Sequence, residues 1–126
     1  VIKQVVSSPY LRAIQSAQIV AARLGVPHKI CPLVRERCLY SCDIGQEVSA
    51  LQKLFPDLDF SDVPAGEWWA PFGETHKSLK QRVQAVRDKY ELDPLVDEML
   101  IVSHYYYING ATGCILDNAE VIEEAL

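Results

Sequence analysis

Two side chains, Arg12 and His104, are of types that bind or transfer charged groups, and each stands where regular structure is expected to begin or end. Ser8 and Pro9 favour a helix start, because the Ser8 hydroxyl can accept a free helical N–H and proline's missing donor costs nothing at the first position. Arg12 would then lie one turn inside a helix over residues 9–24, near its unpaired N–H groups. This pattern predicts a site for a phosphate or a carboxylate, with a surface salt bridge as the alternative role of Arg12.

His104 stands at the end of a predicted strand over residues 99–103, a run that is apolar up to Ser103. A continuous apolar run without alternation is typical of a central parallel strand that is covered on both faces. Ligands of open α/β sheets gather beyond the carboxyl ends of such strands. We therefore expect His104 at the edge of the sheet where chemistry occurs, although a purely structural histidine is the alternative.

The elements that must position these residues alternate along the chain. Strands are predicted over residues 2–6, 28–31 and 99–103, and helices over residues 9–24, 47–55, 75–90 and 106–114. The first helix carries apolar residues at steps of three and four and is expected to end at Gly25 as its C-cap. Residues 56–73 are predicted to be irregular, and residues 118–126 fit either a strand or a helix. The order of these elements predicts an α/β fold.

Length and composition exclude several classes of protein. The 126 residues suit a single domain over 1–126, with 49% hydrophobic and 23% charged residues. A net charge of −5 argues against a general nucleic-acid-binding surface, and no apolar stretch approaches the roughly 20 residues of a membrane span. The four cysteines form no Cys-x-x-Cys pair, which favours reduced thiols in the cytoplasm, or in an organelle if a targeting segment has been removed.

Four segments resemble the histidine phosphatase superfamily, the phosphoglycerate mutase-like proteins. They are Ser-Ser-Pro-x-x-Arg-x-x-Gln-Ser-Ala over residues 7–17, Val-Arg-Glu-Arg over residues 34–37, Gly-Glu-Thr over residues 73–75, and Ser-His at residues 103–104. They follow one another in the family's order over nearly the whole chain. The resemblance implies a three-layer α/β/α domain with a mostly parallel central sheet.

The resemblance also implies roles for individual residues. Arg12 and Ser103 would bind the phosphate, with Ser103 shaping the turn, and His104 would donate to the phosphoryl oxygens. Glu36 would protonate the leaving oxygen and then activate water. The alternative for Glu36 is a solvated carboxylate whose pKa is lowered by the adjacent Arg35 and Arg37. The family chemistry passes through a phosphohistidine and needs neither metal nor cofactor.

Two features depart from the family pattern. The Arg-His-Gly motif that carries the nucleophilic histidine is absent, since none of His28, His76 and His104 has those neighbours. Either a further strand precedes Val1 or the protein lacks it. In addition, tyrosines at residues 105–107 replace the glycines that usually follow the Ser-His pair, and their rings could narrow the pocket.

Two functional hypotheses follow. The first is a metal-independent phosphatase or mutase that acts on a phosphate monoester, either a phosphorylated small molecule or a phosphoprotein. The second is a catalytically inactive scaffold or subunit of a larger assembly, and a homo-oligomer is compatible with both. Trp68 and Trp69 would either cover the pocket or close the edge of the core, and Glu74 is expected to favour its helix start through the helix dipole.

Overall fold

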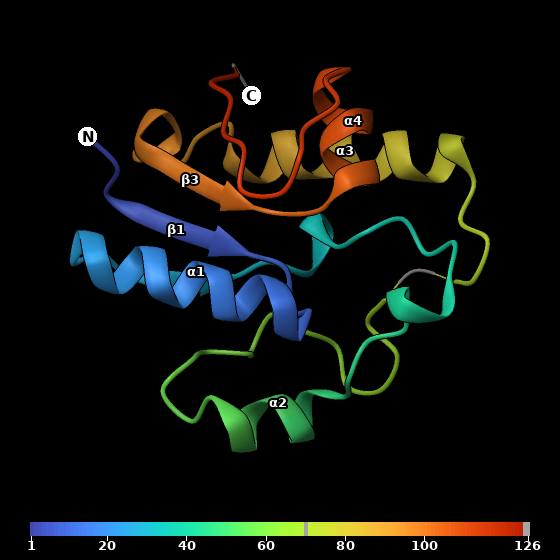
Figure 1. Cartoon of the computed structure of the whole chain (residues 1–126), viewed down its shortest axis with the longest axis horizontal. Helices are drawn as coiled ribbons and strands as arrows, with labels where there is room; N and C mark the ends of the chain where they lie inside the picture. The colour runs from blue at the N-terminus through green and yellow to red at the C-terminus, as the bar shows by residue number, and fades with distance from the viewer. Residues whose placement is uncertain (70, 125–126) are drawn as a thin grey trace.

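The computed structural model describes residues 1–69 and 71–124. Its centre is a parallel sheet in which β1 (Gln4–Ser7) lies between β2 (His28–Ile30) and β3 (Met99–Val102). Ser7 is paired with Ile30 on one side and with Val102 on the other. The carboxyl ends of the three strands therefore lie side by side at the same end of the sheet, as Figure 1 shows for β1 and β3.

Helices cover both faces of the sheet, so the α/β fold class is confirmed (Figure 1). On one face α1 (Leu11–Leu24) packs Ala17 and Ala21 against Val5. On the other face α3 (His76–Tyr90) and α4 (Tyr105–Thr112) cover Val6 and Ile101. This division follows from strand geometry, because successive side chains of β1 point to opposite faces.

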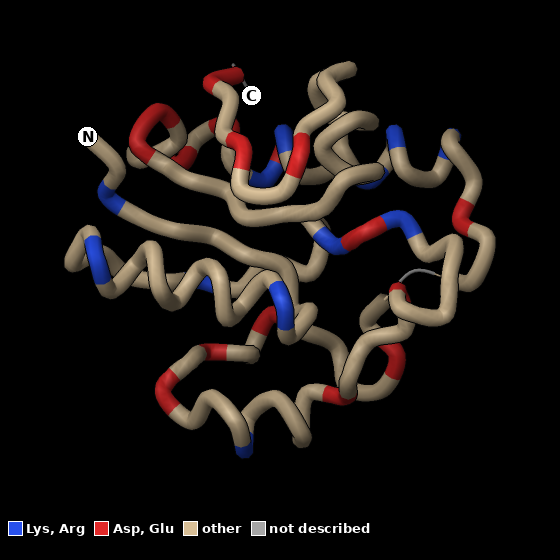
Figure 2. Tube along the Cα trace, in the orientation of Figure 1, with Lys and Arg blue, Asp and Glu red and all other residues tan. Residues whose placement is uncertain are grey.

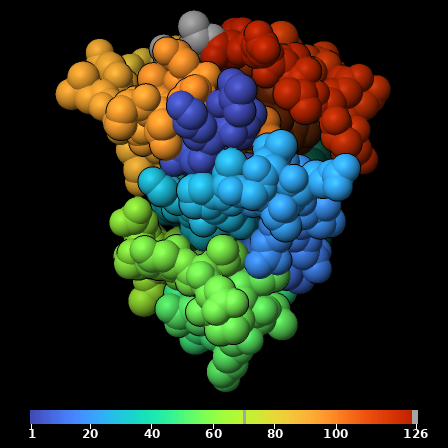
Figure 3. Space-filling model, turned by 90° about the vertical axis from the view of Figure 1, so that its left-hand side faces the viewer, coloured from blue at the N-terminus to red at the C-terminus, as the bar shows by residue number. Residues whose placement is uncertain are grey.

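A second apolar cluster lies beyond α1. Tyr10, Ile14, Leu51 and Trp68 are buried there together, and Leu51 belongs to the short helix α2 (Val48–Leu54). The space-filling view shows the blue surface of α1 next to the green segment that includes α2 (Figure 3). Short turns of 3-10 helix complete the fold: Pro32–Val34, Ser41–Asp43 and Val96–Glu98. Within residues 1–69 and 71–124, no helix has both the length and the apolar content to span a membrane.

The start of α1 differs from the prediction. The helix begins at Leu11 with Tyr10 as its N-cap, so Pro9 lies outside it and Ser8 does not cap it. The Ser8 hydroxyl instead accepts the N–H of Tyr10 at 3.4 Å, just before the helix, and also lies 2.6 Å from His104 Nε2. The predicted C-cap is confirmed, because Gly25 has φ 68° and its N–H is directed at the carbonyls of residues 21 and 22.

The predicted positions of the other elements agree within a few residues, except near the C-terminus. Residues 118–124 form neither the strand nor the helix that the sequence allowed, and residues 125–126 lie outside the described part of the chain.

Candidate functional site

The edge at which β1 and β3 end brings together two segments that are far apart in the sequence. Since Ser7 and Val102 are paired neighbours, the chain leaves both strands at the same place. His104 is the N-cap of α4 and is 7% exposed. Its Nε2 lies 2.6 Å from the Ser8 hydroxyl. The structure thus places His104 at the strand end that the sequence predicted, and it adds Ser8 as its partner.

His104 is uncharged at neutral pH. Burial, with smaller effects from Arg12 and Arg82, lowers its pKa from 6.5 to about 3. Its ring also packs edge-on against Tyr10 at a centroid distance of 5.0 Å. A neutral imidazole can donate one hydrogen bond and accept another.

Arg12 contacts the same tyrosine as His104. Its guanidinium carbon is 4.6 Å from the centroid of the Tyr10 ring, so Arg12 and His104 share this ring as a neighbour. Arg12 Nη1 donates to the carbonyl of Cys42 at 3.1 Å, and Nη2 lies 3.6 Å from Asp43 Oδ1. The side chain is half-exposed, and most of its donors remain available to an anion.

Asp43 is a site residue that the sequence analysis missed. Its side chain is buried, and Oδ2 accepts the N–H groups of Leu39 and Tyr40 at 3.1 and 2.9 Å. The Tyr10 hydroxyl donates to its carbonyl. The contacts with Leu39 and Tyr40 are local to the 3-10 turn over Ser41–Asp43. The contacts with Tyr10 and Arg12 join distant parts of the chain, and no local motif predicts them.

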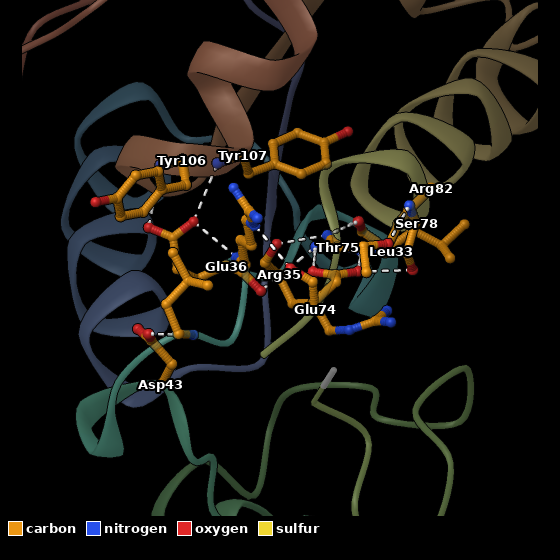
Figure 4. Close-up of polar contacts among 12 residues, drawn as sticks. Leu33, Arg35, Glu36, Asp43, Glu74, Thr75, Ser78, Arg82, Tyr106 and Tyr107 are labelled. Atoms are coloured by element: carbon orange, nitrogen blue, oxygen red, sulfur yellow. Dashed lines mark hydrogen bonds and ion pairs between the residues drawn. The ribbon is translucent and has the colours of Figure 1, made fainter. Parts of the chain in front are cut away.

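Glu36 is buried rather than solvated, so the alternative of an exposed carboxylate between two arginines is wrong. Its Oε1 accepts the N–H groups of Arg37 and Tyr107 at 2.8 and 3.0 Å, and its Oε2 accepts that of Tyr106 at 3.2 Å. Figure 4 shows the carboxylate directed at the first turn of α4. Burial raises the pKa of Glu36, and the three N–H donors oppose this rise.

The guanidinium groups of the two flanking arginines are engaged with backbone carbonyls rather than with Glu36, and Arg37 favours the ionised carboxylate through its backbone N–H. Arg35 Nη1 donates to the carbonyl of Pro32 at 3.2 Å, and Arg37 Nε donates to the carbonyl of Glu74 at 2.8 Å. In Figure 2 the segment over residues 35–37 is visible as a blue, red and blue run between the sheet and α3.

Glu74 forms a buried ion pair in addition to its position at the start of α3. It precedes Thr75, the N-cap of α3, and is 4% exposed. Its Oε1 lies 2.6 Å from Nη2 of Arg82, which is also buried. The sequence does hold a signal for Arg82, since this charged residue falls among Leu79, Val83 and Val86 on the apolar face of the helix.

The remaining predicted residues shape the surroundings of the site. The Ser103 hydroxyl donates to the carbonyl of Val34 at 2.6 Å, which joins the strand end to the turn before Glu36. Trp68 is buried edge-on against Tyr10 at 4.8 Å, as expected for a residue that closes the core. Tyr107 is buried in the core.

Two hollows differ in their relation to these residues. One of about 240 Å³ is lined by Arg12 and Tyr10, together with Gln15, Ile44 and Gln46. A larger one of about 890 Å³ lies along β3, α3 and α4, and its lining includes neither Arg12 nor His104. The smaller hollow therefore lies beside Arg12, but its lining does not include His104.

The cysteines and acidic residues do not form a metal centre in the described residues. All four cysteines are free, and no group of three His, Cys, Asp or Glu side chains among residues 1–69 and 71–124 could hold a metal ion.

A comparison with protein families matches residues 1–121 to the model of the histidine phosphatase superfamily (branch 1). No curated protein matches the chain significantly. The match covers nearly the whole sequence and includes Arg12, Glu36, Ser103 and His104.

Proposed function

The chain belongs to the histidine phosphatase superfamily, a family of phosphoryl-transfer enzymes, and from this membership we propose that it acts in metal-independent phosphoryl transfer from a phosphate monoester. The substrate would be a phosphorylated small molecule or a phosphoprotein. The single observation that supports the proposal is the contact of Ser8 with His104 at the ends of β1 and β3, where Arg12 and His104 both lie against the Tyr10 ring and the buried carboxyl of Glu36 lies at the start of α4.

Each group has a chemical task in this proposal. Arg12 holds the non-bridging oxygens through its fork of N–H donors, and the neutral His104 donates one further hydrogen bond as charge develops. Glu36, with its raised pKa, gives a proton to the leaving oxygen as the bond from phosphorus to that oxygen breaks. In the second step water attacks phosphorus, the bond between phosphorus and the acceptor nitrogen breaks, and the ionised Glu36 accepts the proton of the water.

The phosphoryl acceptor of the first step is a histidine in the family mechanism. Neither His28 nor His76 has the Arg-His-Gly neighbours of that residue, and His104 is assigned to binding. The roles proposed here are therefore those of the phosphate-binding and proton-transfer groups.

The test is hydrolysis of p-nitrophenyl phosphate by the complete gene product in excess EDTA. Hydrolysis is expected with the wild type and not with Arg12→Ala or His104→Ala, while circular dichroism checks that each variant is folded. Hydrolysis at the wild-type rate in either variant would refute the role assigned to that residue.

A second candidate function is an inactive scaffold, and one specific observation favours it. The Tyr106 and Tyr107 N–H groups, which could bind an anion at the start of α4, are occupied by Glu36. Absence of both hydrolysis and phosphate binding in the wild type would support this alternative over the enzyme.

A further inference from the structure

Arg82 is a charged residue buried inside the molecule, and its guanidinium donates both to a carboxylate and to three backbone carbonyls. Nε and Nη2 bind the two carboxylate oxygens of Glu74 at 3.2 and 2.6 Å. The other contacts go to backbone carbonyls of one short segment: Nη1 donates to Leu33 at 2.9 Å and to Arg35 at 2.6 Å, and Nη2 donates to Glu36 at 3.4 Å. Figure 4 shows this arrangement between α3 and the segment that carries Glu36.

The segment over residues 35–39 has no helix or strand of its own. Buried carbonyls need hydrogen-bond donors, and here Arg82 supplies them in place of a neighbouring strand. The same guanidinium carbon lies 5.4 Å from the ring centroid of Tyr107, whose N–H donates to the Glu36 carboxylate. Arg82 thus contacts both the segment that carries the carboxylate and the helix that receives it.

Glu74 extends this arrangement to the far end of the segment. Its N–H donates to the carbonyl of Cys38 at 3.2 Å, and its carbonyl accepts Arg37 Nε at 2.8 Å. Its carboxylate also accepts the Ser78 hydroxyl at 3.3 Å. The residues on both sides of Glu36 are therefore tied to this one ion pair.

Stability alone is a weak explanation for such a pair. Removing two charges from water is costly, and well-packed apolar side chains often replace a buried ion pair without loss of stability. An apolar replacement would, however, leave three backbone carbonyls without donors. The contacts of Arg82 are better explained by a role in holding the segment over residues 35–39 in place than by a contribution of the Arg82–Glu74 ion pair to stability.

We propose that Arg82, with Glu74 as its counter-ion, is the positioning residue that holds the Glu36 carboxylate against the first N–H groups of α4. The catalytic meaning of this placement rests on the proposed function, in which Glu36 transfers a proton. The placement itself can be tested without any activity.

The test is amide hydrogen exchange of Tyr106 and Tyr107 by NMR in Arg82→Lys. These N–H groups belong to the first turn of α4, so their protection depends on Glu36. We expect exchange at least about tenfold faster than in the wild type, the factor that one hydrogen bond to a charged group provides. The exchange rates of the same two amides in Glu36→Gln provide the reference for a contact in which the carboxylate itself is altered.

Arg87→Lys is the matched control, because Arg87 lies on the same helix and donates to the carbonyl of Ala111 at the other end of α4. It should leave the exchange of both tyrosine amides unchanged. Glu74→Gln keeps the size of the side chain and removes the counter-ion, so it serves if Arg82→Lys does not fold. Wild-type exchange of both amides in whichever of these two variants folds would overturn the proposal.

Kinetics of the complete gene product separate this proposal from the proposed function. In whichever of Arg82→Lys and Glu74→Gln folds, kcat should fall about tenfold for an alkyl phosphate, whose leaving group needs a proton, and KM should be unchanged. The loss should be less than about twofold for an activated aryl phosphate. Equal losses for both substrates would contradict a positioning role, whereas an inactive wild type would contradict the proposed function and leave the exchange experiment decisive.

Discussion

The burial of His104 makes a quantitative prediction about stability and pH. The folded protein holds this imidazole at a pKa of about 3, whereas the unfolded chain has the ordinary value of 6.5. Between these values the unfolded state binds a proton that the folded state does not, so the free energy of unfolding falls as the pH falls below 6.5. Each pH unit corresponds to about 1.4 kcal/mol, which gives a loss of about 2 kcal/mol at pH 5.

The perturbation that isolates this effect is His104→Gln. Glutamine can still hydrogen-bond the Ser8 hydroxyl, but it does not titrate. Urea unfolding at pH 7.5 and pH 5 should show a loss in the wild type that exceeds the loss in the variant by about 2 kcal/mol. Glu36 has a raised pKa and changes stability in the opposite direction, but it is present in both proteins and largely cancels. Equal losses in the two proteins would refute the assignment of a buried, neutral His104.

Three further predictions concern single substitutions. Glu36→Gln should lower kcat for an alkyl phosphate by about 10²- to 10⁴-fold, because a general acid is lost; steady-state kinetics at pH 6 would show this, and an unchanged kcat would exclude Glu36 as the acid. Ser8→Ala should lower the free energy of unfolding by about 1–3 kcal/mol, since it removes the buried partner of His104; in urea unfolding, a loss no larger than that of the exposed Ser16→Ala would contradict the contact. Gly110→Ala should cost about 1–3 kcal/mol in the same assay, because its Cβ would lie 2.8 Å from Cδ2 of the buried Leu79; unchanged stability would show that this packing is wrong.

The sequence predicted those parts of the fold that depend on local pattern. The bounds of β3 and α1 are predicted to within a few residues, because burial of these elements requires apolar residues at a regular spacing in the sequence. Gly25 was predicted as a C-cap for a similar reason, since a left-handed residue after a helix strongly favours glycine. The family motifs add the order of these elements.

The contacts of the site could not be predicted in the same way. Ser8 has the residue type of a helix cap, but its hydroxyl also hydrogen-bonds His104, which lies 96 positions later in the chain. The flanking arginines of Glu36 suggested a lowered pKa, whereas burial by α4 and the surrounding core raises it. In both cases a tertiary contact determines the hydrogen bonding or the pKa of the side chain, and such a contact cannot be predicted from the local sequence.

The proposed function depends most on the binding of one anion by both Arg12 and His104. The direct measurement is an NMR titration of the complete gene product with inorganic phosphate at pH 7, following the side-chain signals of both residues. The two signals are expected to move together to saturation while the exposed His76 ring stays unchanged, and Arg12→Ala should weaken binding about tenfold. Phosphate that saturates the protein without moving the His104 signal, or that binds Arg12→Ala as tightly as the wild type, would contradict the account.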